Sequence, residues 1–156
     1  DILILGAGGA VRGVLPILIA AKPASILIAN RTVARAEALA ELFADLFPVE
    51  VLGFEQLSSY RRQSPDWIIN GTAAGLSGEM PDLPDSLIGR HTSCYDMVYA
   101  PGGTVFQHWA NKLGAQQSLD GSGMLVEQAA ESFRIWRGVR PETAEVIEAL
   151  HESLAK

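Results

Sequence analysis

The chain has a single cysteine, few charged residues and no long apolar run, and each shortage excludes a class of protein. Cys94 cannot form an internal disulfide, and it has no metal-ligand spacing with the scattered histidines His91, His108 and His151. No apolar run approaches the roughly 18 residues that a membrane span requires, and no signal-peptide pattern is present. We therefore expect no metal, no membrane partner and a cytoplasmic location.

Basic residues are also scarce. The 12 Lys and Arg residues are outnumbered by 18 Asp and Glu, which gives a net charge of -6 over 156 residues. Nucleic acids and anionic membranes attract concentrated basic surfaces, so we expect neither as the main partner. With 48% hydrophobic and 19% charged residues, the chain can bury a core as one domain, residues 1–156.

Short apolar runs alternate with helical patterns along the sequence. The expected strands are Ile2–Leu5, Ser25–Ala29, Val49–Gly53, Trp67–Asn70 and Ser93–Val98. The expected helices are Ala10–Ala21, Thr32–Phe47, Gly103–Leu113, Gly121–Trp136 and a last helix that begins at Pro141, with Gly71–Gly89 as a loop. Nearly continuous apolar strands are typical of parallel sheets that are covered on both faces. The pattern predicts an α/β fold of the Rossmann type: a doubly wound, mainly parallel sheet with helices on both faces.

A glycine-rich turn follows the first expected strand. Residues 6–13 read GAGGAVRG, which departs from the G-x-G-x-x-G pattern because Val11 stands at the third glycine position. Glycines at such a turn let backbone N–H groups at a helix N-terminus approach a pyrophosphate. A tight turn can also use glycine for its conformation alone. Its place after the first strand favours a dinucleotide site.

The end of the second expected strand indicates which dinucleotide binds. NAD sites usually carry Asp or Glu roughly 20 residues past the glycine turn, where it accepts from the ribose 2′-hydroxyl. This chain has no acid there and has instead Asn30, Arg31, Thr32 and Arg35. Guanidinium groups and neutral donors suit a 2′-phosphate, which a carboxylate would repel. The alternative is that Thr32 only caps a helix and the arginines are solvated; together, the four residues favour NADP.

Five segments resemble the NADP-binding half of the shikimate dehydrogenase family. They are GAGGAVRG at 6–13, NRTVAR at 30–35, NGTAAG at 70–75, YDMVY at 95–99 and DGSGMLVEQ at 120–128. Their order and spacing agree over essentially the whole chain. The resemblance implies reversible reduction of 3-dehydroshikimate to shikimate by NADPH, a step on the route to chorismate and the aromatic amino acids.

The resemblance also implies roles for single residues. The pyrophosphate would be held by Gly6, Ala7, Gly8, Gly9 and Ala10, and the adenosine 2′-phosphate by Asn30, Arg31, Thr32 and Arg35. Thr72 and Ala73 would lie along the cofactor, Met97 and Gly121 would contact its nicotinamide end, and Tyr99 and Gln128 would reach the substrate. Without the family, Met97 is an ordinary core residue, Gly121 a helix-start turn, Tyr99 a half-buried aromatic and Gln128 a helix-surface residue.

The chain departs from the family pattern in two ways. The family's Asn-Ala-Thr-Ser-Ser-Gly segment is NGTAAG at 70–75 here, which removes hydroxyl groups at positions 73 and 74. The family's catalytic Lys and Asp lie in an N-terminal domain before the glycine turn, and Lys22, Lys112 and Lys156 match no such motif. Because the chain starts without Met on a buried-type strand, we expect a fragment with no catalytic residue, which binds NADP without turnover.

The C-terminal part, about 121–156, is expected to pack on the absent N-terminal domain. Its last helix carries an apolar stripe made of Val146, Ile147, Leu150 and Leu154. The whole protein would be a monomer or homodimer that acts on shikimate and 3-dehydroshikimate. Two alternatives stay open: a relative that uses quinate, another cyclic hydroxy acid or NAD, and a non-catalytic NADP-binding module. Tyr99 and Gln128 favour the enzyme, because a module has no substrate to meet.

Overall fold

The computed structural model describes residues 1–59 and 63–154, and its centre is a six-stranded parallel sheet in the order β3-β2-β1-β4-β5-β6. The strands are β1 (Ile2–Leu5), β2 (Ile26–Ala29), β3 (Val49–Leu52), β4 (Trp67–Asn70), β5 (Ser93–Asp96) and β6 (Gln117–Leu119). The chain winds outward from β1 in one direction to β3 and then in the other direction from β4 to β6. This confirms the expected doubly wound Rossmann-type sheet.

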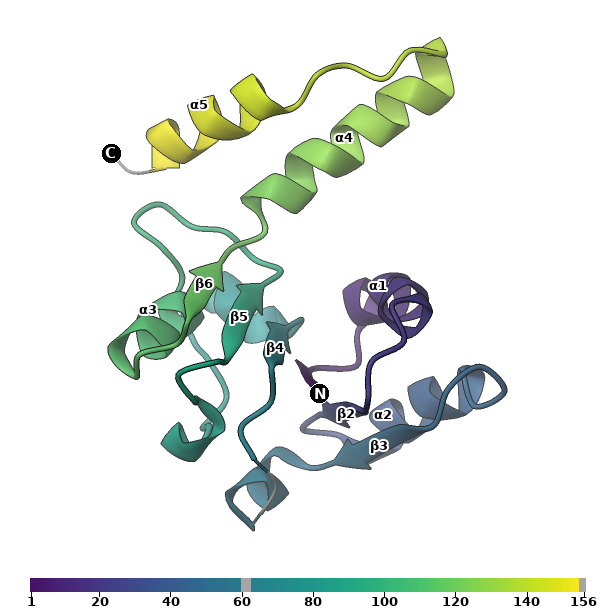
Figure 1. The fold of residues 1–156 in the computed structure, drawn as a ribbon, viewed down its shortest axis with the longest axis vertical. Coiled ribbons are helices and arrows are strands. Elements are labelled where there is room, and N and C mark those ends of the chain that lie inside the picture. The colour runs from purple at the N-terminus through teal and green to yellow at the C-terminus, as the bar shows by residue number, and fades with distance from the viewer. Residues whose placement is uncertain (60–62, 155–156) are drawn as a thin grey trace.

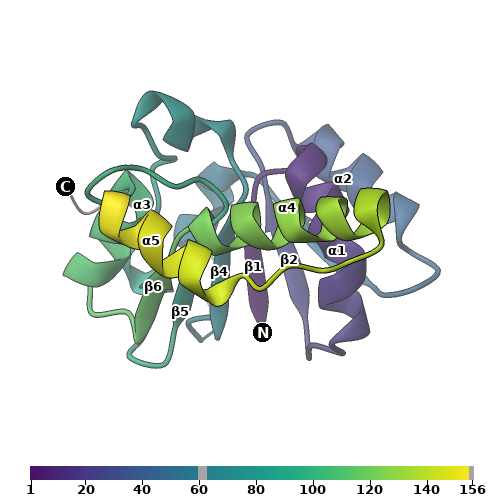
Figure 2. The same cartoon turned by 90° about the horizontal axis from the view of Figure 1, so that it is seen from above.

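Helices cover both faces of this sheet. They are α1 (Gly9–Ala20), α2 (Val33–Leu42), α3 (Val105–Lys112), α4 (Ser122–Arg137) and α5 (Ala144–Leu154), with short 3₁₀ helices η1 (Phe54–Ser59), η2 (Ala73–Ser77) and η3 (Asp85–Leu87). Helices α1 and α2 lie on one face and α3 on the other (Figure 1). After β6, α4 runs back toward the side that α1 covers, and α5 returns alongside α4 (Figure 2).

The two halves of the core follow from the alternation of side chains along β1. Leu3 and Leu5 pack on the α3 side with Phe106, whereas Ile4 packs on the opposite side with Val11 and Leu15 of α1. Each of these side chains is at most 2% exposed. Burial of each such side chain contributes roughly 1.5–3 kcal/mol. A strand that is buried on both faces has no polar alternation, which is why the apolar runs predicted it.

The structure corrects several expected boundaries. The three-residue strand β6 was not expected, because Gln117-Ser118-Leu119 is a short edge strand without an apolar run. The segment 71–89 contains η2 and η3 rather than loop alone. Helix α2 ends at Leu42 and not at Phe47, because the chain tightens into turns in which Phe43 N–H donates to Ala40 and Ala44 N–H to Glu41.

Side chains explain two further differences. Strand β5 ends at Asp96 rather than Val98, because the Asp96 carboxylate accepts the Val98 N–H (3.1 Å) and turns the chain. Helix α5 begins at Ala144 rather than Pro141, because Arg140 and Thr143 are held to Glu127 of α4. The segment between these helices therefore runs along α4 before it coils.

Candidate functional site

The backbone ladder continues one residue beyond the strands and brings three expected site residues to one edge of the sheet. Gly6 N–H donates to the Ala29 carbonyl (2.8 Å), and Gly71 N–H donates to the Leu5 carbonyl (2.8 Å). Met97 N–H donates to the Asn70 carbonyl (2.9 Å). This edge holds the carboxyl ends of the strands, and the winding direction reverses here between β1 and β4. Open α/β sheets bind their ligands at such a reversal.

Glycine is required where β1 and β4 end side by side. Gly6 has a φ of +99°, and a Cβ there would lie 2.9 Å from the Gly71 carbonyl oxygen. A Cβ at Gly71 would overlap the Val11 Cγ2 atom and lie 3.1 Å from the Met97 sulfur. The Val11 side chain, 0% exposed, thus fills the space that Gly71 leaves open. Val11 in the glycine turn and Gly71 in the NGTAAG segment are two sides of one packing contact.

The N-terminus of α1 has backbone N–H groups without helical partners, and no atoms lie close to Gly8 and Gly9 there. Gly8 is the N-cap and makes no side-chain cap bond, and the first turn contains no acidic residue. The helical ladder begins with Arg12 N–H donating to Gly8, so the N–H groups of Gly9, Ala10 and Val11 lie outside it. A Cβ added at Gly8 or Gly9 would meet nothing within 4 Å. Free N–H groups at the positive end of a helix dipole suit a pyrophosphate.

The end of β2 forms an exposed basic surface. Arg31, Thr32 and Arg35 are exposed, and Asn30 Nδ2 donates to the Thr32 carbonyl (2.8 Å). Thr32 occupies the N-cap position of α2, but its hydroxyl makes no cap bond and is free for a ligand. Among residues 1–59 and 63–154, no ion pair involves Arg31 or Arg35. Unpaired guanidinium groups with no acid in the first turn of α2 suit a phosphate dianion.

A buried polar network joins the ends of β4 and β5. Asp96 Oδ1 accepts from Asn70 Nδ2 (3.1 Å) and Val98 N–H (3.1 Å), and Oδ2 accepts from the Thr104 hydroxyl (2.6 Å). Asn70 Oδ1 in turn accepts the N–H (3.1 Å) and the hydroxyl (2.8 Å) of Thr72. Burial raises the pKa of the Asp96 carboxyl, although these hydrogen bonds act in the opposite direction. The network fixes Thr72, one of the expected cofactor residues.

Sequence reasoning gave no role to Asn70, Asp96 or Thr104. Asn70 and Asp96 are each the last residue of an otherwise buried strand, and both are 0% exposed. A polar residue that closes an apolar strand was the signal that could have found them, because such a residue meets its counterpart at the same edge of a parallel sheet. Thr104 is found through its capping box with Gln107 at the start of α3.

The residues expected at the nicotinamide end lie against one another, whereas those expected at the substrate are separate. A Cβ at Gly121 would overlap the Met97 carbonyl, so the two backbones are in close contact. Ala73 begins η2 beside Thr72 and is exposed. Tyr99 is 40% exposed after β5, and Gln128 is exposed on α4. Within the described residues, neither the Tyr99 nor the Gln128 side chain makes a hydrogen bond.

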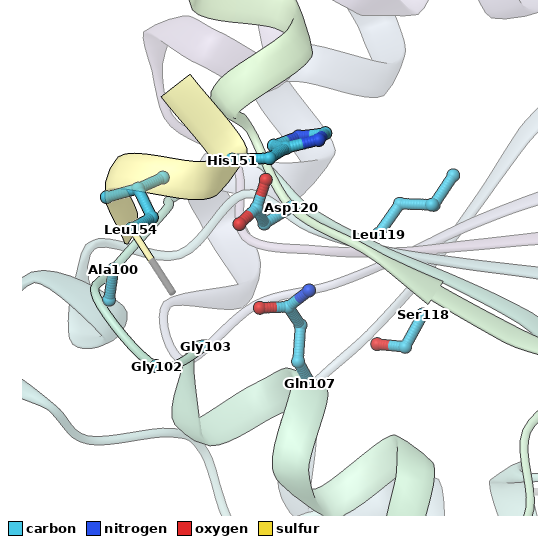
Figure 3. A pocket seen from close by; sticks show the side chains of 9 residues that line it. All are labelled: Ala100, Gly102, Gly103, Gln107, Ser118, Leu119, Asp120, His151 and Leu154. Carbon is cyan, nitrogen blue, oxygen red and sulfur yellow. The ribbon is translucent and has the colours of Figure 1, made fainter. Parts of the chain in front are cut away.

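A second group of reactive residue types surrounds a pocket of about 500 Å³ between α3, β6 and α5 (Figure 3). Asp120 and His151 line it, and both contact Ser122: Ser122 Oγ donates to Asp120 Oδ1 and lies 2.8 Å from His151 Nε2. Because Ser122 gives its one proton to Asp120, His151 is the donor to Ser122 Oγ. The bond between Ser122 and His151 joins α4 to α5. Because Ser122 is 0% exposed, its hydroxyl cannot reach a substrate as a nucleophile.

The described part of the chain shows no reactive thiol, no metal site and no membrane-spanning helix. Burial raises the pKa of the Cys94 thiol to about 12, which keeps it neutral and unreactive. No group of three or more His, Cys, Asp or Glu side chains among the described residues could hold a metal ion. No described helix combines the length and the apolar character that a membrane span needs.

Comparisons with known proteins find similar sequences and folds along most of the chain. The family model "Shikimate / quinate 5-dehydrogenase" matches residues 1–77, and the model "Shikimate 5'-dehydrogenase C-terminal domain" matches residues 121–151. The shikimate dehydrogenase (NADP(+)) of Alkalilimnicola ehrlichii is 59% identical over 150 residues, which cover 96% of this chain and 54% of the relative.

Two solved structures are similar along the chain. A shikimate dehydrogenase in complex with NADP+ is 34% identical, with a TM-score of 0.80 over 99% of this chain and 55% of that one. The enzyme from Thermus thermophilus in complex with shikimate is 33% identical, with a TM-score of 0.79 over 100% of this chain and 55% of that one. The chain spans about half the length of these relatives. Family models at both ends and identity along the length lead to one conclusion: this chain belongs to the shikimate dehydrogenase family.

Proposed function

We propose that this chain is the NADP-binding half of a shikimate dehydrogenase, which reduces 3-dehydroshikimate reversibly to shikimate with NADPH. One observation carries the proposal: the N-terminus of α1, which has no side-chain cap and no atom close to Gly8 and Gly9, lies at the same sheet edge as Arg31 and Arg35, which form no ion pair among the described residues. The relatives named above support it, because one is named for NADP(+) and another was solved with NADP+. The step belongs to the route toward chorismate and the aromatic amino acids.

The residues at this edge fit NADP from end to end. The turn Gly6–Ala10 would hold the pyrophosphate with its free N–H groups, and Asn30, Arg31, Thr32 and Arg35 would hold the 2′-phosphate. Thr72 and Ala73 would lie along the cofactor between the pyrophosphate and the nicotinamide ring, and Met97 and Gly121 would contact the ring. When bound, NADPH supplies the hydride for the carbonyl carbon. This chain binds and orients that cofactor.

The proton donor for the carbonyl oxygen belongs to another part of the protein in this proposal. Lys22 follows α1 and Lys112 ends α3, so both precede strands and lie at the opposite edge of the sheet, whereas Lys156 lies outside the described residues. We therefore assign the acid–base pair to the N-terminal half that this chain does not match, and we assign Tyr99 and Gln128 to the substrate. The exposed apolar side chains of Ile135 (67%), Trp136 (79%) and Val139 (65%) offer a surface for that half.

The cofactor is tested by calorimetric titration of the protein with NADP+ and with NAD+. Arg31→Ala should weaken NADP+ binding by about 2–4 kcal/mol, roughly 30- to 1000-fold, because charge-assisted bonds to the 2′-phosphate are lost. Binding of NAD+, which has no 2′-phosphate, should barely change. Arg90→Ala is the matched control, because Arg90 is exposed and precedes β5 at the opposite edge.

Equal binding of both dinucleotides by the folded wild type would refute the assignment of NADP, and it would favour a relative that uses NAD. If the protein as its gene encodes it prefers NADP+ but turns over neither shikimate nor quinate, a non-catalytic module is favoured. Assays with shikimate and with quinate also separate the two substrates that the family description names. We propose a cytoplasmic location, because the single thiol of this chain is buried and forms no disulfide, which suits reducing surroundings.

A further inference from the structure

The structure buries a carboxylate between the two strand ends that carry the nicotinamide-side residues. Asp96 is 0% exposed, and no ion pair in the described part of the chain involves it. Three donors hold it instead: the Asn70 amide, the Val98 N–H and the Thr104 hydroxyl. A neutral side chain would close the strand at a lower desolvation cost, which points to a role for these acceptor oxygens.

Asp96 determines which way the Asn70 amide faces. Its Oδ1 accepts the Val98 N–H, so it is an acceptor, and the group that Asn70 turns toward it must be the Nδ2 donor. Asn70 Oδ1 therefore faces Thr72 and accepts both its N–H and its hydroxyl. The single hydroxyl proton of Thr72 is used in this bond, so Thr72 presents only lone pairs to a ligand.

We propose that Asp96 is a positioning residue that holds the loops after β4 and β5 in one arrangement at the nicotinamide end of the bound dinucleotide. The inference rests on the proposed function. Oδ1 holds Val98, the neighbour of Met97, directly, and it holds Thr72 through Asn70. Oδ2 ties the same unit to the start of α3 through Thr104 (2.6 Å). A group of the ligand that meets Thr72 must be a hydrogen-bond donor.

The hydrogen-bond network around Asp96 does not extend to the adenosine end of the dinucleotide site. In the sheet order, β1 separates β2 from β4, and Asn30 bonds within its own loop, to the Thr32 carbonyl. Loss of Asp96 should therefore affect binding of the nicotinamide half and spare the adenosine half. A role in folding alone would not separate the two halves.

The test compares NADP+ with adenosine 2′,5′-bisphosphate, which lacks the nicotinamide half, in the protein as its gene encodes it. Asp96→Ala should raise the Kd of NADP+ by about tenfold, the equivalent of one or two lost hydrogen bonds, and leave the Kd of the bisphosphate within about twofold. Asp96→Asn should restore most of the NADP+ affinity, because its carbonyl oxygen still accepts from Asn70 and Val98. Asn70→Ala tests the link itself, because it removes both the donor to Asp96 and the acceptor for Thr72.

Thr92→Ala is the control. Thr92 is also 0% exposed and hydrogen-bonded, to the Pro65 carbonyl (2.8 Å), but it precedes β5 at the opposite end of the strand. It should lower stability without changing the ratio of the two Kd values. If Asp96→Ala does not fold, Asn70→Ala decides the question, and an unchanged NADP+ affinity in it overturns the proposal. Equal losses for both ligands overturn it too. Failure of the proposed function looks different, because then the wild type itself shows no preference for NADP+ over NAD+.

Discussion

At the scale of single residues, the glycine turn is best understood together with the residue it packs on. Val11 breaks the G-x-G-x-x-G pattern, yet it is fully buried over a glycine at the end of β4. The two backbones approach because Gly71 has no side chain, and the valine then fills the space. In the sequence, Val11 and Gly71 are two separate departures from the expected patterns. In the structure, they are the two sides of one packing contact.

This contact predicts a coupled pair of substitutions. Gly71→Ala should destabilise the protein by about 1–3 kcal/mol, because the new methyl group overlaps the Val11 Cγ2 atom. In the Val11→Ala background the same change should cost much less, since the overlapping atom is gone. Urea unfolding of the four proteins gives the coupling free energy, expected at about 0.5–3 kcal/mol. Additive effects would contradict the contact, and Gly123→Ala, where no atom lies within 4 Å and φ is not positive, is the control for replacing a glycine without overlap.

At the scale of elements, apolar runs predicted the buried strands well and the polar or edge segments poorly. The bounds Ile2–Leu5 and Trp67–Asn70 are confirmed, because both strands are central and covered on both faces. The edge strand β6 has a polar sequence and is held by pairing with β5, which no local pattern reveals. Asp96 ends β5 through a side-chain bond to Val98, again a contact that periodicity does not encode.

For the C-terminal helices, too, the local sequence pattern predicts that the helices exist but not where they begin. Their existence was predicted from apolar spacing, but the start of α5 depends on long-range contacts of Arg140 and Thr143 with Glu127. Of the predicted apolar stripe, Ile147, Leu150 and Leu154 are half-buried, whereas Val146 remains 53% exposed. Helix α5 thus packs on α4, and the more exposed apolar side chains are those of Ile135, Trp136 and Val139 at the end of α4 and just after it.

One of these fastenings can be tested at the level of the helix. His151→Ala removes the donor to Ser122 Oγ and should weaken the attachment of α5 by about 1 kcal/mol. Amide hydrogen exchange in Ala144–Leu154 should become roughly fivefold faster, while α1 and α2 keep their protection. His108→Ala, an exposed histidine on α3, is the control. Unchanged exchange in α5 would mean that His151 does not hold the helix.

At the scale of the whole molecule, the sheet edge assembles what four separate sequence segments supply. The start of α1, the end of β2, the NGTAAG segment and the turn after β5 meet there because parallel strands end on the same side. The order of these segments was visible in the sequence. The bond between Asn70 and Asp96, which joins the last two of these segments, was not visible, because it depends on two side chains that are 26 residues apart.

The measurement that tests the central claim most directly is NADPH consumption with 3-dehydroshikimate. It is followed for the protein as its gene encodes it and for residues 1–156 alone. We predict turnover by the encoded protein and, for residues 1–156 alone, NADP+ binding without turnover, because we propose that this half orients the cofactor and that the proton donor lies in the other half. Turnover by residues 1–156 alone, or an encoded protein that binds NADP+ and leaves 3-dehydroshikimate unreduced, would contradict the account.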